Sequence, residues 1–296
     1  MGDVLADLIK AIYNVGYSIW NYLIDIAISL FTTSPTAANG SVYSTTHTLF
    51  LSISSISVPI CIVFFFLALI KDVIGSPPEQ QARQFMQDGI KFGVMIGIVA
   101  NLWTIMGYVM QIADGLTNDL AVSASYDLAI SSDLETIIIE ATTLPTFDFT
   151  HIGESIGDII GFIFTVLLFF LTSLATLVII IASAISIISC GFQRILKPLV
   201  IMPFSSVTVA MATGSGEASR VTTQYIKTFF GLCIAGAFMV ICVNLGVALS
   251  NGLIVFDYAS LSTFEKVLFI SVQNAITPIV ISGLVKSADT IIGKFL

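Results

Sequence analysis

The chain has 296 residues, of which 56% are hydrophobic and only 10% are charged. Soluble proteins carry about 25% charged residues, so this composition leaves too little polar surface to cover a water-soluble globule of this size. Soluble enzymes, nucleic-acid-binding domains and disordered chains are therefore excluded. We expect an all-α polytopic membrane protein, in which the four cysteines are small apolar side chains within helices.

Residues 1–32 are predicted to form an N-terminal amphipathic helix. Polar residues recur there every three or four positions, at Asp3, Asp7, Lys10, Asn14, Ser18, Asn21, Asp25 and Ser29. This spacing places them along one face of a helix and leaves the apolar residues on the other. The helix is expected to lie in the membrane interface or to line a wet cavity, and an ordinary sixth span is the alternative.

The remaining residues, 33–296, are predicted to form a transmembrane domain with about five membrane helices. A helix needs about 20 apolar residues to cross the hydrocarbon layer. The stretches of this kind are residues 49–70, 90–112, 159–193, 228–249 and 267–285. The third has no charged residue and is long enough to tilt or to extend beyond the membrane. Pro278 predicts a kink in the fifth.

Two sets of uncharged residues in these spans are expected to mediate helix packing. Gly89, Gly93 and Gly97 recur every four residues, a spacing that lets a neighbouring helix approach closely. The neighbour is either another helix of this chain or another subunit. Amide side chains occur at Asn101, Gln111, Asn244, Gln273 and Asn274. They are expected to hydrogen-bond between helices or to line a wet path.

The distribution of charge predicts the orientation of the chain in the membrane. Residues 114–158 contain no Lys or Arg and nine acidic residues. Basic residues cluster instead in the loop between the first two spans, in residues 191–227 and in the C-terminal tail. Because basic loops stay in the cytoplasm, the N-terminal segment and the acidic loop are predicted to be outside and the C-terminus inside.

The cytoplasmic loop at residues 191–227 is the most unusual segment. Pro198 and Pro203 interrupt an apolar stretch, residues 199–212, that is too short to cross the membrane. We therefore expect a re-entrant or interfacial segment, with Arg194 and Lys197 anchored at the lipid headgroups and a sharp turn at Gly214-Ser-Gly216. Its basic residues, Arg194, Lys197, Arg220 and Lys227, are expected to face a cytoplasmic partner or a translocating substrate.

The order of these features resembles the TrbL-like family. A long apolar helix, a basic Lys-Pro segment that reaches a second proline, a small-residue turn and the sequence Tyr-Ile-Lys-Thr-Phe-Phe-Gly follow one another in residues 191–231. Members of that family are polytopic inner-membrane subunits of type IV secretion and conjugation systems. The short length is similar to versions from conjugative elements of Gram-positive bacteria.

The resemblance implies a channel or scaffold subunit, not an enzyme, that helps to move a DNA–protein substrate across the cytoplasmic membrane. It implies that the protein forms a homo-oligomer, a pentamer or larger ring, with a secretion ATPase, other subunits, lipids and single-stranded DNA with relaxase as partners. No cofactor or metal site is expected, because His47 and His151 lack a metal-binding spacing. A small-solute transporter or ion channel subunit is the alternative.

Overall fold

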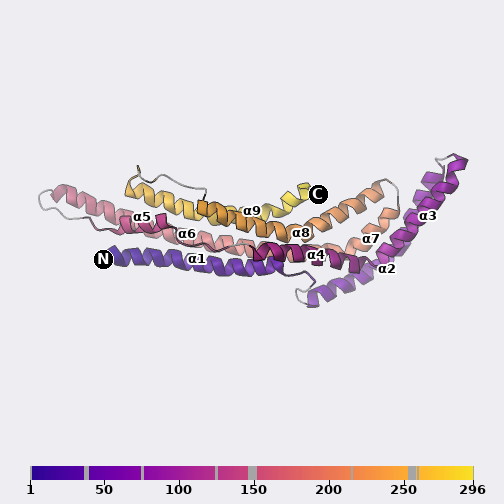
Figure 1. Cartoon of the computed structure of the whole chain (residues 1–296), viewed down its shortest axis with the longest axis horizontal. Helices are drawn as coiled ribbons and strands as arrows, with labels where there is room; N and C mark the ends of the chain where they lie inside the picture. Colours follow the sequence, from indigo (N-terminus) through magenta and orange to yellow (C-terminus); the bar gives the residue numbers. More distant parts are fainter. Residues whose placement is uncertain are drawn as a thin grey trace. The chain divides into compact units, whose positions relative to one another are not determined.

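The computed structural model describes residues 2–36, 40–74, 77–123, 126–145, 152–214, 216–252, 258 and 260–295. Every regular element in these ranges is a helix. In chain order they are α1 (Gly2–Thr32), α2 (Gly40–Ile74), α3 (Pro78–Ala100), α4 (Leu102–Val122), α5 (Ser132–Thr142), α6 (Ile152–Ile201), η1 (Met202–Phe204), α7 (Ser205–Ala210), η2 (Met211–Thr213), α8 (Glu217–Gly252) and α9 (Thr263–Phe295). The prediction of an all-α fold is confirmed (Figure 1).

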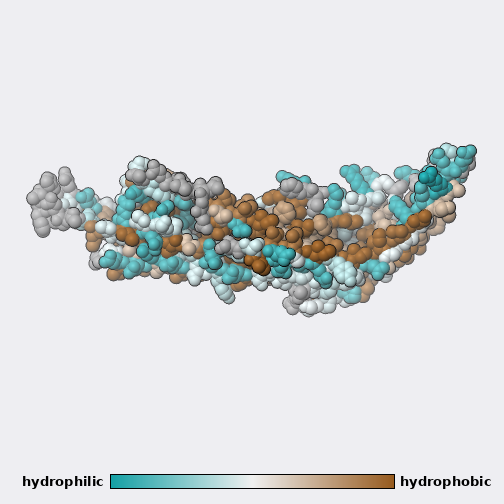
Figure 2. Space-filling view, viewed as in Figure 1, coloured by the Kyte–Doolittle hydropathy of each residue, from teal (hydrophilic) through white to brown (hydrophobic). Residues whose placement is uncertain are grey.

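Four of the described helical stretches are long and apolar enough to cross a membrane: Gly40–Lys71, Ser155–Thr213, Glu217–Leu249 and Thr263–Ala288. The pair α3 and α4 makes a fifth if it counts as one broken span. Large apolar side chains also face outward, as Figure 2 shows in brown. On α6, for example, Leu167 and Leu171 are 62% and 64% exposed. Such a surface is costly in water and favourable in lipid, so the chain is a polytopic membrane protein.

The predicted second span, residues 90–112, is not one straight helix. It bends by 66° between α3 and α4. Asn101 lies at the break, where its side-chain amide donates to the Gly97 carbonyl oxygen at 3.0 Å. Asparagine competes for backbone hydrogen bonds in this way and favours helix ends. Asn101 is therefore an exposed capping residue that hydrogen-bonds within its own helix, so the predicted hydrogen bond to another helix is wrong, and a wet path stays a prediction.

The helices divide into two compact units, and α1, α6, α8 and α9 contribute residues to both. Unit 1 comprises residues 1–29, 123–190 and 239–287. Its core forms where α1 packs against α6. Trp20 and Ile24 of α1 are fully buried, and the rings of Tyr13 and Phe169 meet edge to face with their centroids 6.4 Å apart. A Cβ atom at Gly16 would lie 3.2 Å from Leu177 Cδ1, so this glycine allows the close approach.

The amphipathic character predicted for residues 1–32 is present in α1. Six of the eight residues of the polar stripe are exposed, and Lys10 and Asn21 are half-buried. The apolar face carries the buried residues Ala6, Ile9, Tyr13, Tyr17, Trp20, Ile24, Ala27 and Phe31. This face is covered by the chain's own helices, so a sixth span is not needed to explain it. Helix α1 has 31 residues and is long enough for a span, but it is not among the described helices that are also apolar enough.

A half-buried amide joins α1 to α9 within unit 1. The Tyr17 hydroxyl donates to Asn274 Oδ1 at 2.7 Å, and the Asn274 amide donates to the Ile270 carbonyl oxygen at 2.7 Å. The predicted role of Asn274 in hydrogen bonding between helices is confirmed. Helix α9 continues through Pro278.

The acidic segment, residues 114–158, is not a simple loop. Asp114 lies inside α4, and α5 forms in the middle of the segment, capped by the Ser131 hydroxyl, which accepts from the Leu134 amide. Two ion pairs hold α5 in unit 1. Lys10 Nζ of α1 lies 3.8 Å from Glu135 Oε1, and Lys266 Nζ of α9 lies 2.8 Å from Glu140 Oε1. Helix α5 therefore lies beside the N-terminal parts of α1 and α9 within unit 1.

A labelling experiment tests on which side of the membrane α5 lies. The native cysteines are buried or half-buried, so an exposed new cysteine can be read separately. Thr136→Cys on α5 should react with an impermeant thiol reagent added to intact cells, because the acidic segment is expected outside. Arg83→Cys on α3 should react only after the cells are permeabilised. The opposite pattern would overturn the predicted orientation.

Unit 2 comprises residues 30–122, 191–238 and 288–296. In it α2 and α3 pack side by side, and η1, α7 and η2 pack against α2. Trp103 of α4 lies among three rings of α2, with centroid distances of 4.9 Å to Tyr43, 4.6 Å to His47 and 5.2 Å to Phe50. His47 thus packs against an aromatic ring, while His151 lies outside the described residues.

Candidate functional site

A buried ion pair lies in the core of unit 2. Arg194 of α6 is 2% exposed and Asp114 of α4 is 5% exposed. Arg194 Nη2 donates to Asp114 Oδ1 at 2.5 Å. Arg194 Nη1 donates to the Thr33 carbonyl oxygen at 2.9 Å, just beyond the end of α1, and a cation is favourable at a helix C-terminus. The guanidinium group thus ties three helices together.

This contact corrects two assignments made from the charge pattern. Arg194 was expected at the cytoplasmic headgroups and Asp114 at the start of the outer acidic loop. Side chains in direct contact cannot lie on opposite sides of about 30 Å of hydrocarbon. Both residues lie inside helices rather than in loops, so neither marks the membrane surface. Buried charges neutralise each other here, which a count of loop charges cannot detect.

The ion pair leaves one polar atom without a partner. Asp114 Oδ2 is buried and accepts no hydrogen bond from any described residue. Helix α8 passes directly over the arginine at Gly236. A Cβ atom there would lie 2.7 Å from Arg194 Cζ and 2.9 Å from Arg194 Nη2. Only glycine therefore fits at position 236 while the pair keeps its geometry.

The proline-containing segment after Arg194 is helical but broken. Helix α6 runs through Pro198 to Ile201, and Pro203 lies in the short turn η1 before α7 and η2. Pro203 lies in the first turn of η1, where its missing N–H is tolerated, whereas Pro198 stays inside α6. Most of the segment is buried, including Met202, Pro203, Ser205, Ser206, Val209 and Ala210. The segment expected to be re-entrant or interfacial is a mostly buried set of short helices, and its position in the membrane stays a prediction.

Hydrogen bonds hold this segment between α2 and α8. The Thr213 hydroxyl donates to the Cys61 carbonyl oxygen of α2 at 3.1 Å. From α8, the Thr222 hydroxyl donates to the Thr208 carbonyl oxygen at 2.6 Å, and the Tyr225 hydroxyl donates to the Ile201 carbonyl oxygen at 3.0 Å. The carbonyl groups that the helix breaks expose are therefore satisfied by side chains.

The four basic residues predicted to form one surface are separated by the fold. Arg194 is buried, so its expected contact with a partner or substrate is wrong. Lys197 is half-buried on α6. Arg220 and Lys227 are exposed on the first turns of α8. The residues still able to meet a partner are therefore Arg220 and Lys227.

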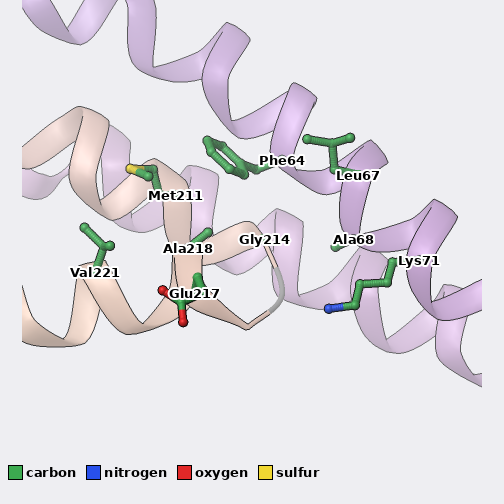
Figure 3. A pocket seen from close by; sticks show the side chains of 9 residues that line it. All are labelled: Phe64, Leu67, Ala68, Lys71, Met211, Gly214, Glu217, Ala218 and Val221. Atoms are coloured by element: carbon green, nitrogen blue, oxygen red, sulfur yellow. The ribbon is translucent and has the colours of Figure 1, made fainter.

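A pocket opens beside the turn between η2 and α8 (Figure 3). Its volume is about 540 Å³. The lining residues are Phe64, Leu67, Ala68 and Lys71 of α2, and Met211, Gly214, Glu217, Ala218 and Val221. The sequence predicted the turn correctly, since Gly216 has a φ of 66°, which favours glycine. A Cβ atom at Gly214 would lie 3.0 Å from both Ala218 Cβ and Phe64 Cδ1, so a side chain there would crowd the pocket wall.

The glycine stripe on α3 has no close neighbour within the described chain. A Cβ atom at Gly89, Gly93 or Gly97 would meet no atom within 4 Å. Of the two predicted neighbours, a helix of the same chain is therefore not packed against these glycines. Glycines that do permit close packing, such as Gly16 and Gly236, lie outside this stripe and are not marked by its four-residue spacing.

Within the described residues, no group of three or more His, Cys, Asp or Glu side chains is placed to hold a metal ion. No family model, curated protein or solved structure matches the chain.

Proposed function

We propose that the protein is a membrane channel or scaffold subunit of a conjugative type IV secretion system. The observation that carries the proposal is the segment at residues 191–227, whose sequence order resembles the TrbL-like family. That segment is built into the core of unit 2 by hydrogen bonds to α2 and α8. A flexible linker between two spans would need no such contacts.

The proposed mechanism is structural. Identical or related subunits surround or support a path through the cytoplasmic membrane, and a separate ATPase supplies the energy. The open stripe at Gly89, Gly93 and Gly97 supports contact with another subunit, because small residues let helix backbones approach closely in lipid. The exposed residues Arg220 and Lys227 are the cationic groups offered to a cytoplasmic partner or to DNA.

A mating assay tests this function. Deleting the gene from its conjugative element should abolish DNA transfer, and the wild-type gene supplied in trans should restore it. The double variant Arg220→Gln with Lys227→Gln should restore transfer only to a level roughly 10-fold lower, since surface charges speed association by this order. Protein levels in the membrane should be unchanged.

Lys286→Gln with Lys294→Gln is the matched control. Both lysines are exposed on α9, so the control removes the same amount of charge from another helix. The proposal for the α8 surface would fail if the control lowered transfer as much as the Arg220 and Lys227 double variant. Normal transfer after deletion of the gene would overturn the secretion function itself.

A transporter or channel for small solutes is the second candidate, and one observation favours it. Ion pairs buried among membrane helices often belong to transport pathways, and Arg194 with Asp114 is such a pair. The protein purified alone and reconstituted into liposomes distinguishes the two functions. Solute flux in the absence of other subunits would favour the transporter, whereas a secretion subunit should give none.

A further inference from the structure

We propose that the pocket between α2 and the start of α8 binds one phospholipid with a zwitterionic, amine-bearing headgroup such as phosphatidylethanolamine. The proposal concerns the chain's own binding chemistry and does not depend on the secretion function. It rests on three observations: where the pocket lies along the membrane helices, what lines it, and which charges remain available in it.

The pocket lies where two membrane helices end. Lys71 is the last residue of the apolar stretch Gly40–Lys71, and Glu217 is the first residue of the stretch Glu217–Leu249. Both residues line the pocket. Because charged residues at the ends of spans sit at the boundary between hydrocarbon and headgroups, the pocket lies at headgroup depth. A lipid can therefore enter it from the membrane without leaving its own leaflet.

The lining suits a molecule with an apolar and a polar part. Six of the lining residues have apolar side chains: Phe64, Leu67, Ala68, Met211, Ala218 and Val221. In Figure 3 the side chains of Phe64, Leu67 and Met211 lie on one side of the pocket, and the charged ends of Lys71 and Glu217 lie on the other. This separation matches the upper part of an acyl chain joined to a charged headgroup.

The two charges are available to a ligand. Lys71 and Glu217 are exposed, and neither side chain forms an ion pair or hydrogen bond with any described residue. The nearby Lys91, by contrast, donates to the Gly214 carbonyl oxygen at 3.2 Å and holds the turn. Lys71 can therefore pair with the phosphate of a lipid headgroup, and Glu217 can pair with its amine. An anionic headgroup would satisfy Lys71 but would be repelled by Glu217.

Native mass spectrometry of the chain in detergent tests the proposal. The protein is titrated with phosphatidylethanolamine or with phosphatidylglycerol of the same acyl chains, and the dissociation constant of the first lipid is measured. The wild type should bind phosphatidylethanolamine more tightly. Lys71→Gln should raise the dissociation constant of both lipids by about five- to tenfold, since one cation near a phosphate contributes that much to binding. Glu217→Gln should remove the preference between them.

Matched controls change the same residue types elsewhere. Lys286→Gln alters an exposed lysine near the end of another span, and Glu79→Gln alters an exposed glutamate of α3. Both should bind lipid like the wild type. Two further variants narrow the pocket: Ala218→Phe from its half-buried wall and Val221→Trp from an exposed position. Each should reduce binding of both lipids, provided that its elution volume and thermal unfolding match the wild type.

Three outcomes would overturn the proposal. The first is that Lys71→Gln and Val221→Trp bind both lipids as tightly as the wild type does. The second is a loss of lipid binding in Lys286→Gln that equals the loss in Lys71→Gln. The third is binding of glycerophosphoethanolamine, which lacks acyl chains, as tight as that of the whole lipid, because the site would then recognise a free headgroup.

Discussion

Arg194→Gln is expected to lower the free energy of unfolding by roughly 3–5 kcal/mol. The substitution leaves Asp114 charged and buried, with its main partner removed. Asp114→Asn should cost a similar amount, because it leaves the buried guanidinium group without its counterion. Thermal unfolding of the purified protein in detergent, followed by circular dichroism, measures both changes as a fall in the unfolding midpoint.

Arg220→Gln is the matched control for this prediction, because it removes an exposed arginine from α8. It should change the free energy of unfolding by less than about 1 kcal/mol, the usual range for surface charges. The double variant Arg194→Met with Asp114→Leu should be less damaging than either single variant, since it removes both buried charges together. If Arg194→Gln and Asp114→Asn lowered the free energy of unfolding no more than Arg220→Gln does, the buried ion pair would be contradicted.

Gly236→Ala is expected to destabilise the protein by roughly 1–3 kcal/mol, the usual cost of overpacking. Its Cβ atom would overlap the Arg194 guanidinium group, which has no free space because Asp114 and the Thr33 carbonyl oxygen hold it on the other side. The fall in the thermal unfolding midpoint should shrink when Gly236→Ala is combined with Arg194→Met and Asp114→Leu, because the clash is then relieved.

Gly161→Ala provides the comparison, because it makes the same chemical change in the membrane helix α6, where no atom lies within 4 Å of the new methyl group. Alanine is the better helix former by about 1 kcal/mol, so this variant should be neutral or slightly more stable. A loss of stability equal to that of Gly236→Ala would mean that the effect comes from the helices themselves and not from the arginine.

The sequence predicted features that depend on neighbours along the chain. The polar stripe of α1 repeats at helical spacing, so the sequence predicted most of its polar exposed positions, although apolar residues such as Val4 and Tyr22 are exposed as well. The uncharged stretch at residues 159–193 predicted a helix longer than the bilayer needs, and α6 has 50 residues, about 75 Å at 1.5 Å per residue. The turn at Gly214 and Gly216 also depends on residues that are close in the sequence, so it could be predicted.

The errors arose where distant residues meet. Arg194 and Asp114 are 80 positions apart, and a charge counted alone is taken for a surface group. Only the fold shows that the two neutralise each other. The prediction for Asn101 differed for another reason, because an amide in an apolar stretch can either bridge two helices or cap one, and the sequence does not show which. The pocket likewise combines α2 with the turn before α8, a pairing that no local pattern predicts.

The hydrogen bond between Tyr17 and Asn274 has a consequence for how the protein is made. The two residues are 257 positions apart, so at about 5–20 residues per second the ribosome needs roughly 13–50 s to supply the second after the first. Helix α1 is therefore synthesised long before α9 can cover its side. During that time the Tyr17 hydroxyl lacks its partner on α9, whereas α6, whose Phe169 packs against Tyr13, is already made.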